Sequence, residues 1–167
     1  MKIIIVLLCC VLLFCSCSNE KNDEITPEQQ AREIQNSIMI CFEKRDSDNL
    51  KALFSKKIQN RSTLDSEIET AFDFIDGKIV SYDEPIPGAA GPIGDKYFGA
   101  TTEKIKTDKD IEYKIDFGGY ESNDKESDNI GVEGIRIVNI TENANLSPNA
   151  SNKERDACCR YIGDYTN

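Results

Sequence analysis

The sequence lacks histidine and tryptophan altogether, and its aromatic content is limited to six tyrosines and seven phenylalanines. Without histidine, the chain cannot assemble a Ser-His-Asp or Cys-His nucleophile system, and it lacks the commonest general base at neutral pH and the commonest zinc ligand. Any catalysis would have to use carboxylates, tyrosine, lysine or cysteine. The absence of tryptophan argues against a large carbohydrate-stacking platform.

Positive charge is scarce as well. The chain has 20 lysines and arginines against 30 aspartates and glutamates, which gives a formal net charge of −10. A polyanion is repelled by nucleic acids and by anionic lipid surfaces, so the composition predicts neither as a partner. The 167 residues are enough for one domain with a sizeable hydrophobic core.

No apolar run is long enough to cross a bilayer comfortably, and the run Ile3–Phe14 instead fits the h-region of a secretion signal. It follows a positively charged start, and the chain turns polar from Ser18 onward. The motif Phe14-Cys15-Ser16-Cys17 resembles a bacterial lipobox, in which a small residue precedes a cysteine that is lipidated and becomes the mature N-terminus. The resemblance predicts a lipoprotein signal peptide over residues 1–16 and lipidation of Cys17.

This N-terminal segment predicts a location more clearly than the rest of the chain predicts an activity. We expect a lipid-anchored protein on the extracytoplasmic face of the cell membrane, with palmitate among its acyl chains and residues 17–26 as a polar tether. Cys15 is the competing lipid acceptor, but it would place the bulky Phe14 immediately before the cleavage site. An ordinary cleaved signal peptide and an uncleaved N-terminal anchor are the alternatives.

Three cysteines follow Cys17 in the chain, at positions 41, 158 and 159. Cys158 and Cys159 are neighbours, too close together for ordinary disulfide geometry, and a bridge from Cys41 to one of them would strand the other. Cys41 lies within an amphipathic pattern, which favours a small buried side chain. A soft metal bound by the neighbouring thiols is the alternative for that pair. No Cys-x-x-Cys pair is present, so neither a zinc knuckle nor a thioredoxin-type site is predicted.

The sequence after the tether has helical periodicity. Thr26-Pro27-Glu28-Gln29 is typical of a helix start, because Thr26 can cap the helix and Gln29 can complete a capping box. Ser47 or Asp48 is expected to cap a second, shorter helix. Gly77 follows the third helix, where a left-handed conformation is common. The apolar spacing predicts helices over residues 27–44, 47–58 and 64–75.

The period then switches to that of β-strands. Residues 111–117 alternate between apolar and charged side chains, which predicts a strand with one buried and one wet face. The apolar register slips at Glu133-Gly134, as a β-bulge would produce. The Pro/Gly-rich segment 85–94 is interpreted as a strand connection, with a ligand-contacting loop as the alternative. The predicted strands are residues 78–83, 97–106, 111–117 and 130–141.

Residues 143–167 are predicted to form a polar C-terminal tail. Pro148 and the small polar residues around it disfavour further strand pairing, so the last strand should end near Glu142. We expect low order over residues 143–156. Docking of a short apolar stretch, residues 157–163, onto the domain is left open.

Together these elements predict one α+β domain over residues 27–142, with three helices packed on a curved four-stranded antiparallel sheet. This order resembles the nuclear-transport-factor-2-like (NTF2-like) cone, and the segments Asn49–Ser55 and Phe72–Tyr82 also look like an uncharacterised family of lipoproteins from Gram-positive bacteria. The resemblance implies a fold and a cellular location, and it identifies no catalytic residue. The predicted core is Ile34, Ile38, Phe42, Leu53, Phe54, Ile68, Phe72, Ile75, Ile115 and Phe117.

Candidates for chemistry are few. The acidic turn Asp124–Asp128 has the alternating carboxylates of a calcium loop, but it lacks the glycine and the bidentate glutamate of the EF-hand pattern, so a solvated turn is favoured. Asp76, Tyr82 and Asp83 cluster around the first strand and could transfer protons in an enzyme, although cap and turn roles account for the two aspartates. No catalytic residue, metal site or cofactor is therefore predicted, and the ligand-binding residues stay unassigned.

The leading functional hypothesis is a non-enzymatic domain that binds a small molecule, a peptide or an envelope component. An anchor, a tether and a fold that can enclose a pocket motivate it. The alternatives are a cone-fold enzyme that uses Asp/Tyr proton transfer and a structural domain that forms a homodimer. An enzyme should hold a carboxylate of raised pKa in a deep pocket, whereas a structural domain should have a filled cone and an apolar outer sheet face.

Overall fold

The computed structural model describes residues 25–89, 95–123 and 126–165 of the chain. These residues form an α+β domain whose antiparallel sheet has the strand order β1-β3-β4-β5-β6, with β2 also paired to β3. The predicted fold class is confirmed at this level. The predicted signal peptide (residues 1–16), Cys17 and most of the tether lie outside the described residues. Within the described ranges, no helix combines the length and the apolar character needed to cross a membrane.

In the described part of the chain, four helices precede the sheet, where three were predicted. Thr26 caps the first helix as expected, because its side chain accepts from the Gln29 amide and Gln29 returns a bond to the Thr26 amide. Asp46 caps the second helix, whereas Ser47 or Asp48 was predicted to do so. The additional helix arises because Ser55 caps a separate short helix within the range 47–58 predicted for the second helix. The helices are α1 (Pro27–Lys44), α2 (Ser47–Leu53), α3 (Lys56–Gln59) and α4 (Leu64–Phe74).

The sheet has six strands in the described residues, where four were predicted. One added strand comes from the Pro/Gly-rich segment, since Pro87 lies on an edge strand, which tolerates a residue without an amide proton. Residues 90–94 of that segment lie outside the described residues. The strands are β1 (Ile79–Ser81), β2 (Ile86–Ala89), β3 (Asp95–Thr107), β4 (Glu112–Asn123), β5 (Gly131–Asn139) and β6 (Cys159–Gly163).

The prediction that the last strand ends near Glu142 is wrong, because β6 pairs antiparallel with β5. Two short helices, α5 (Ile140–Ala144) and α6 (Asn152–Ala157), cover half of the segment 143–156 that was predicted to have low order. Ser151 and Glu154 form a capping box that starts α6. Ile162 on β6 is fully buried. A strand of five residues becomes stable only through its neighbour, so its own sequence carried little signal.

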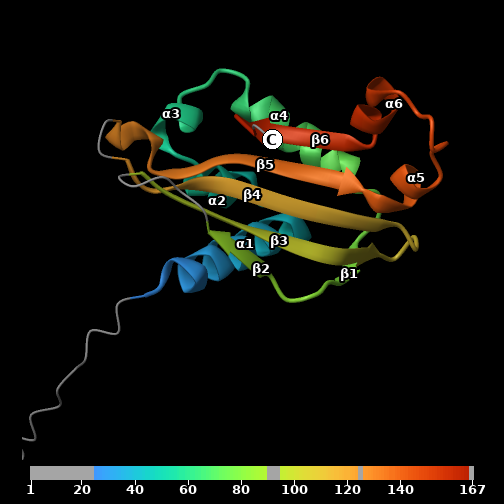
Figure 1. Cartoon of the computed structure of the whole chain (residues 1–167), viewed down its shortest axis with the longest axis horizontal. Helices are drawn as coiled ribbons and strands as arrows, with labels where there is room; N and C mark the ends of the chain where they lie inside the picture. The colour runs from blue at the N-terminus through green and yellow to red at the C-terminus, as the bar shows by residue number, and fades with distance from the viewer. Residues whose placement is uncertain (1–24, 90–94, 124–125, 166–167) are drawn as a thin grey trace, which may run out of the picture.

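The two faces of the sheet have different surroundings. In Figure 1, α1 and α4 lie on the same side of the sheet, behind β3 and behind β5–β6 respectively. We call this side the covered face and the opposite side the open face. Eight of the ten predicted core residues are buried, while Ile34 and Leu53 are partly buried and pack against the same cluster.

The bulge predicted at Glu133-Gly134 is confirmed. Gly118 of β4 pairs with Gly134 and Gly119 pairs with Val132, which leaves Glu133 as the extra residue on β5. Gly77 has a φ of +97°, in agreement with its predicted left-handed conformation. Both features shape the domain locally, and the bulge also places Glu133 beside the turn that follows β6, where the Glu133 carbonyl accepts from the Asp164 amide at 2.8 Å.

Candidate functional site

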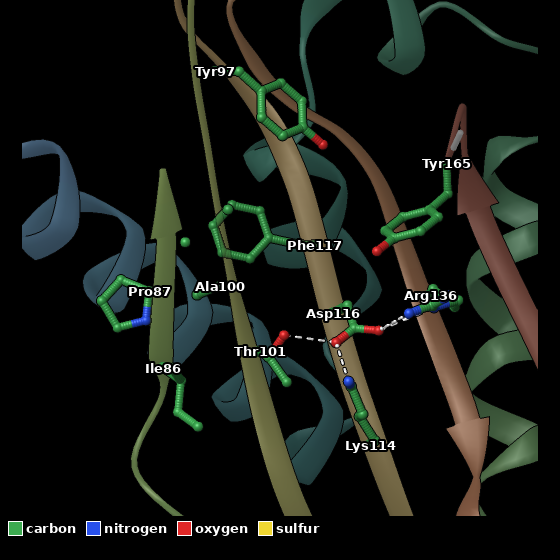
Figure 2. Close-up of a pocket in the computed structure, with 12 residues that line it drawn as sticks. Ile86, Pro87, Tyr97, Ala100, Thr101, Lys114, Asp116, Phe117, Arg136 and Tyr165 are labelled. Carbon is green, nitrogen blue, oxygen red and sulfur yellow. Dashed lines mark hydrogen bonds and ion pairs between the residues drawn. The ribbon is translucent and has the colours of Figure 1, made fainter. Parts of the chain in front are cut away.

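The open face carries a hollow of about 480 Å³. Its walls come from β2, β3, β4 and β5 and from the residues that follow β6, so five separate parts of the chain contribute to it (Figure 2). The volume lies within the range of pockets that bind small molecules, although the hollow is shallow rather than enclosed. Its polar side chains are Tyr97, Thr101, Lys114, Asp116, Arg136 and Tyr165.

A polar row crosses the floor of this hollow because the strand register places Thr101, Asp116 and Arg136 directly opposite one another. Asp116 accepts from the Thr101 hydroxyl at 2.7 Å and from Nε and Nη2 of Arg136 at 3.0 and 2.6 Å. Arg136 binds Oδ2 of Asp116, and the ammonium of Lys114 lies 3.4 Å from Oδ1, the oxygen that also accepts from Thr101. Asp116 is only 4% exposed, and a charge buried to this extent needs such partners. Asp116 therefore acts as the anchor for two cations.

A row of glycines lies beside the polar row, with Gly88, Gly99, Gly118 and Gly134 paired across four strands. A Cβ on Gly118 would collide with the hydroxyl of Tyr97, and a Cβ on Gly134 would lie 2.6 Å from the backbone nitrogen of Tyr165. The missing side chains thus allow two tyrosines to lie close against the sheet. Gly88 is different, since a Cβ there would meet no atom within 4 Å.

Tyr165 reaches the open face because the chain turns sharply after β6. Gly163 has a φ of +75°, a conformation that favours glycine, and Asp164 is then held by ion pairs with Lys57 and Arg61. The ring of Tyr165 lies under the guanidinium of Arg136, 5.1 Å from ring centre to carbon. In Figure 2, Tyr97 and Tyr165 stand on opposite sides of β4, and both hydroxyls point toward that strand.

The tyrosines of the hollow are neutral hydrogen-bonding groups at neutral pH. Burial raises the pKa of Tyr97, and the neighbouring Tyr120 and Glu133 raise it further. Burial also raises the pKa of Tyr165, with the charge of Asp116 as the next cause. Among the lining residues that the structure describes, the charged groups are Lys114, Arg136 and Asp116, which gives these residues one positive charge in excess on a chain of net charge −10.

The candidate proton-transfer residues do not meet in a common site. Asp76 pairs with Lys109, and Asp83 pairs with Lys104 at 2.9 Å. Burial raises the pKa of Tyr82, with Glu43 as the second cause. None of the three lines the hollow on the open face. Their positions agree with the cap and turn roles that the sequence favoured.

Cys41, Cys158, Cys159 and the described residues 126–128 of the acidic turn are not among the described lining residues of the hollow. Cys41, Cys158 and Cys159 are free thiols, with Cys41 and Cys158 buried and Cys159 half-buried. Residues 124–125 of the acidic turn lie outside the described residues, and Glu126 accepts a hydrogen bond from Asn129 at 2.7 Å. Among the described residues, no group of three or more cysteines, aspartates and glutamates is placed to hold a metal ion.

The residues of the hollow could be predicted only in part from the amino-acid sequence. The alternation in β4 placed Lys114 and Asp116 on the wet face, but nothing local indicated that Arg136 and Thr101 would lie opposite Asp116. The Pro/Gly-rich segment 85–94 was interpreted as a strand connection, with a ligand-contacting loop as the alternative, and its residues Ile86, Pro87 and Gly88 line the hollow. Tyr165 was missed because it belongs to the segment assigned to a tail.

Comparison with known proteins assigns the chain to a family whose function is unknown. No curated protein matches the sequence. A family model described as a domain of unknown function (DUF5104) matches residues 37–142, which run from the middle of α1 into α5. The match includes Tyr97, Thr101, Lys114, Asp116 and Arg136 of the hollow but ends before β6 and Tyr165. Because it covers more than half of the chain, the protein belongs to the DUF5104 family.

Proposed function

We propose that this protein is an extracytoplasmic lipoprotein, held at the membrane by a lipid on Cys17, whose open sheet face binds a small molecule or peptide without chemical conversion. The observation that supports binding is the hollow, in which side chains from separate strands are held in a fixed arrangement around the buried Asp116–Arg136 pair. Preorganised polar groups in a concave surface are typical of ligand sites.

We keep the NTF2-like resemblance for the fold, but we place the ligand on the open face of the sheet and not on the covered face. The contacts of α1 with β2 and β3 are in keeping with a helix laid along a curved sheet. The space between that helix and the sheet, however, is filled by buried side chains such as Ile38, Phe42 and Ile115. The hollow on the open face is therefore the better candidate for a ligand.

Binding is favoured over Asp/Tyr catalysis by the state of the groups in the hollow. A general base needs an accessible lone pair and a pKa near the working pH. Asp116 is engaged by Thr101, Arg136 and Lys114, which suits a structural counter-charge. The raised pKa values of Tyr97 and Tyr165 lower the ionised fraction of each side chain at neutral pH, so less tyrosinate is present to act as a base.

A thermal-shift screen of the full-length chain in detergent, against metabolites and envelope fragments, tests the ligand-binding role. Gly88→Phe should fill the hollow without a backbone clash, because the space next to Gly88 is open. Val80→Phe is the matched control, since Val80 is 62% exposed and lies outside the hollow's lining. Compounds that stabilise the wild type and Val80→Phe but not Gly88→Phe would support the proposal. A screen that finds no such compound would contradict the proposed ligand-binding role.

The proposed anchor has its own test. Cys17→Ala should move the protein from the membrane fraction to the soluble fraction or leave an unprocessed precursor, whereas Cys15→Ala should stay membrane-bound and processed. Retention of processed Cys17→Ala at the membrane, with loss of Cys15→Ala, would assign the lipid to Cys15 instead.

A homodimer is the second candidate, because large side chains remain exposed on the open face. Tyr97, Tyr161 and Ile86 are 38%, 39% and 57% exposed. A second copy could cover them in place of a ligand. Light scattering on the purified chain decides this point, since dimerisation through the open face should be weakened by Gly88→Phe and unaffected by Val80→Phe.

A further inference from the structure

We infer that the hollow on the open face takes the carboxylate of a small organic acid, with Lys114 as the group that contacts it. This inference rests on the proposed ligand-binding function and names the class of ligand. It is carried by the arrangement of the three charged side chains on the floor of the hollow.

The local charge favours an anion. Lys114 and Arg136 share one buried carboxylate, Asp116, so the described lining residues keep one positive charge in excess. Glu103, which is not one of these lining residues, forms a second and longer ion pair with Lys114 at 3.8 Å. A ligand amine would need Asp116 as its counter-ion, but both oxygens of that carboxylate are already engaged. A ligand with one negative charge would balance the excess charge of the described lining residues.

Lys114 is the better placed of the two cations for contact with a ligand. Arg136 is bound to Asp116 through two nitrogens and stacks on Tyr165. The ammonium of Lys114 lies 3.4 Å from Asp116 and 3.8 Å from Glu103, both longer than the usual 2.7–2.9 Å of a charged hydrogen bond. Its side chain is 29% exposed, so water is partly excluded while a ligand can still reach it. A carboxylate could therefore approach Lys114 more closely than its protein partners do.

The rest of the lining fits an apolar body attached to the acid. Ile86 and Pro87 on β2 form an apolar side of the hollow, and the ring of Tyr97 covers Gly118 at its end. The neutral hydroxyls of Tyr97 and Tyr165 add hydrogen bonds that do not depend on ligand charge. This combination points to an aliphatic or aromatic monocarboxylate of modest size.

Three matched probes test the inference: cyclohexanecarboxylate, cyclohexanecarboxamide and cyclohexylmethylamine. Saturation-transfer NMR titrations with the full-length chain in detergent should give a carboxylate affinity about tenfold higher than that of the amide, with the amine weakest. High salt should reduce the carboxylate preference. Lys114→Gln should abolish the preference, and Lys114→Arg, which keeps the charge, should retain most of it. Lys106→Gln removes an exposed lysine outside the hollow and should leave the preference unchanged.

The outcomes separate this inference from the function on which it rests. Equal binding of the amide and the carboxylate, or tighter binding of the amine, would overturn the carboxylate assignment while leaving a ligand site intact. An equal loss of preference in Lys106→Gln and Lys114→Gln would also overturn it, because the effect would then be one of net charge. If no probe binds although other compounds bind in a Gly88-dependent manner, the assignment is wrong and the binding function stands. Absence of any Gly88-dependent ligand would reject both.

Discussion

The covered and open faces of the sheet are built from alternate residues of the same strands, yet they serve different purposes. In β4, Tyr113 and Ile115 lie on the covered face and are at most 1% exposed. Their neighbours Lys114 and Asp116 face the open side and hold the charged cluster. The period of two lets one strand supply hydrophobic burial on one face and a preorganised polar site on the other. Substitutions should therefore separate stability from binding according to the face they change.

The largest effect is expected from removing β6, which contributes to both faces. Deleting residues 158–167 removes a paired strand and the fully buried Ile162, so we expect a loss of about 4–6 kcal/mol, or roughly 10–20 °C in the thermal midpoint. Circular dichroism melting curves measure this change. A midpoint within a few degrees of the wild type would restore the tail interpretation.

Adjacent residues of β6 give the control for that deletion. Ile162 faces the core and Tyr161 is 39% exposed on the open side. Ile162→Ala should cost about 2–5 kcal/mol, whereas Tyr161→Ala should cost about 1 kcal/mol or less. Similar losses from the two variants would show that β6 does not divide the faces as described.

Phe72→Ala tests the covered face without touching the hollow. Phe72 is 2% exposed and packs edge-on against Phe42, with ring centres 5.1 Å apart. Its removal should reduce the free energy of unfolding by about 3–5 kcal/mol in denaturant titrations. Ligand binding by the folded fraction should be unchanged. A loss below ~1 kcal/mol would mean that α4 does not pack on the core through this ring.

Asp116→Asn tests the open face and should affect both properties. The change leaves Arg136 without its buried counter-charge, and we expect a loss of about 2–3 kcal/mol, less than for a fully buried pair because a quarter of the Arg136 side chain is exposed. Ligand binding should fall as well, since the cations lose their anchor. A double-mutant cycle with Arg136→Gln measures the coupling, and a coupling near zero would contradict the assigned role of the pair.

The smallest effect is expected at Glu133, the bulge residue between the faces. Burial raises the pKa of Glu133, against the hydrogen bond from Ser55 and the charge of Lys57, and one of its carboxylate oxygens is buried without a partner among the described residues. A raised folded-state pKa means that the folded chain is favoured at a pH below the ordinary value of 4.5 and loses that advantage as the pH rises through the folded pKa.

Glu133→Gln should therefore be slightly more stable than the wild type at neutral pH, and the difference should disappear as the pH falls below about 4.5. Denaturant midpoints across the pH range measure it. A variant that is less stable at neutral pH would show that the ion pair with Lys57 outweighs the cost of burial.

The amino-acid sequence determined those features that depend on neighbouring residues. The capping box at Thr26, the alternation of β4, the bulge at Glu133 and most of the core could be predicted because each is encoded within a few positions of the chain. The expected lipid anchor rests on the same kind of local pattern and stays a prediction.

Only the tertiary structure decided which residues meet across the sheet. A strand's alternation fixes its two faces, but it carries no information on its partner or register, so the row of Thr101, Asp116 and Arg136 could not be read from the chain. The same reason explains why β6 was missed. Its pairing with β5 closes a loop of 19 intervening residues, from Ile140 to Cys158, and closing this loop costs conformational entropy. Burial of side chains such as Ile162 offsets this entropic cost, and that burial exists only in the complete fold.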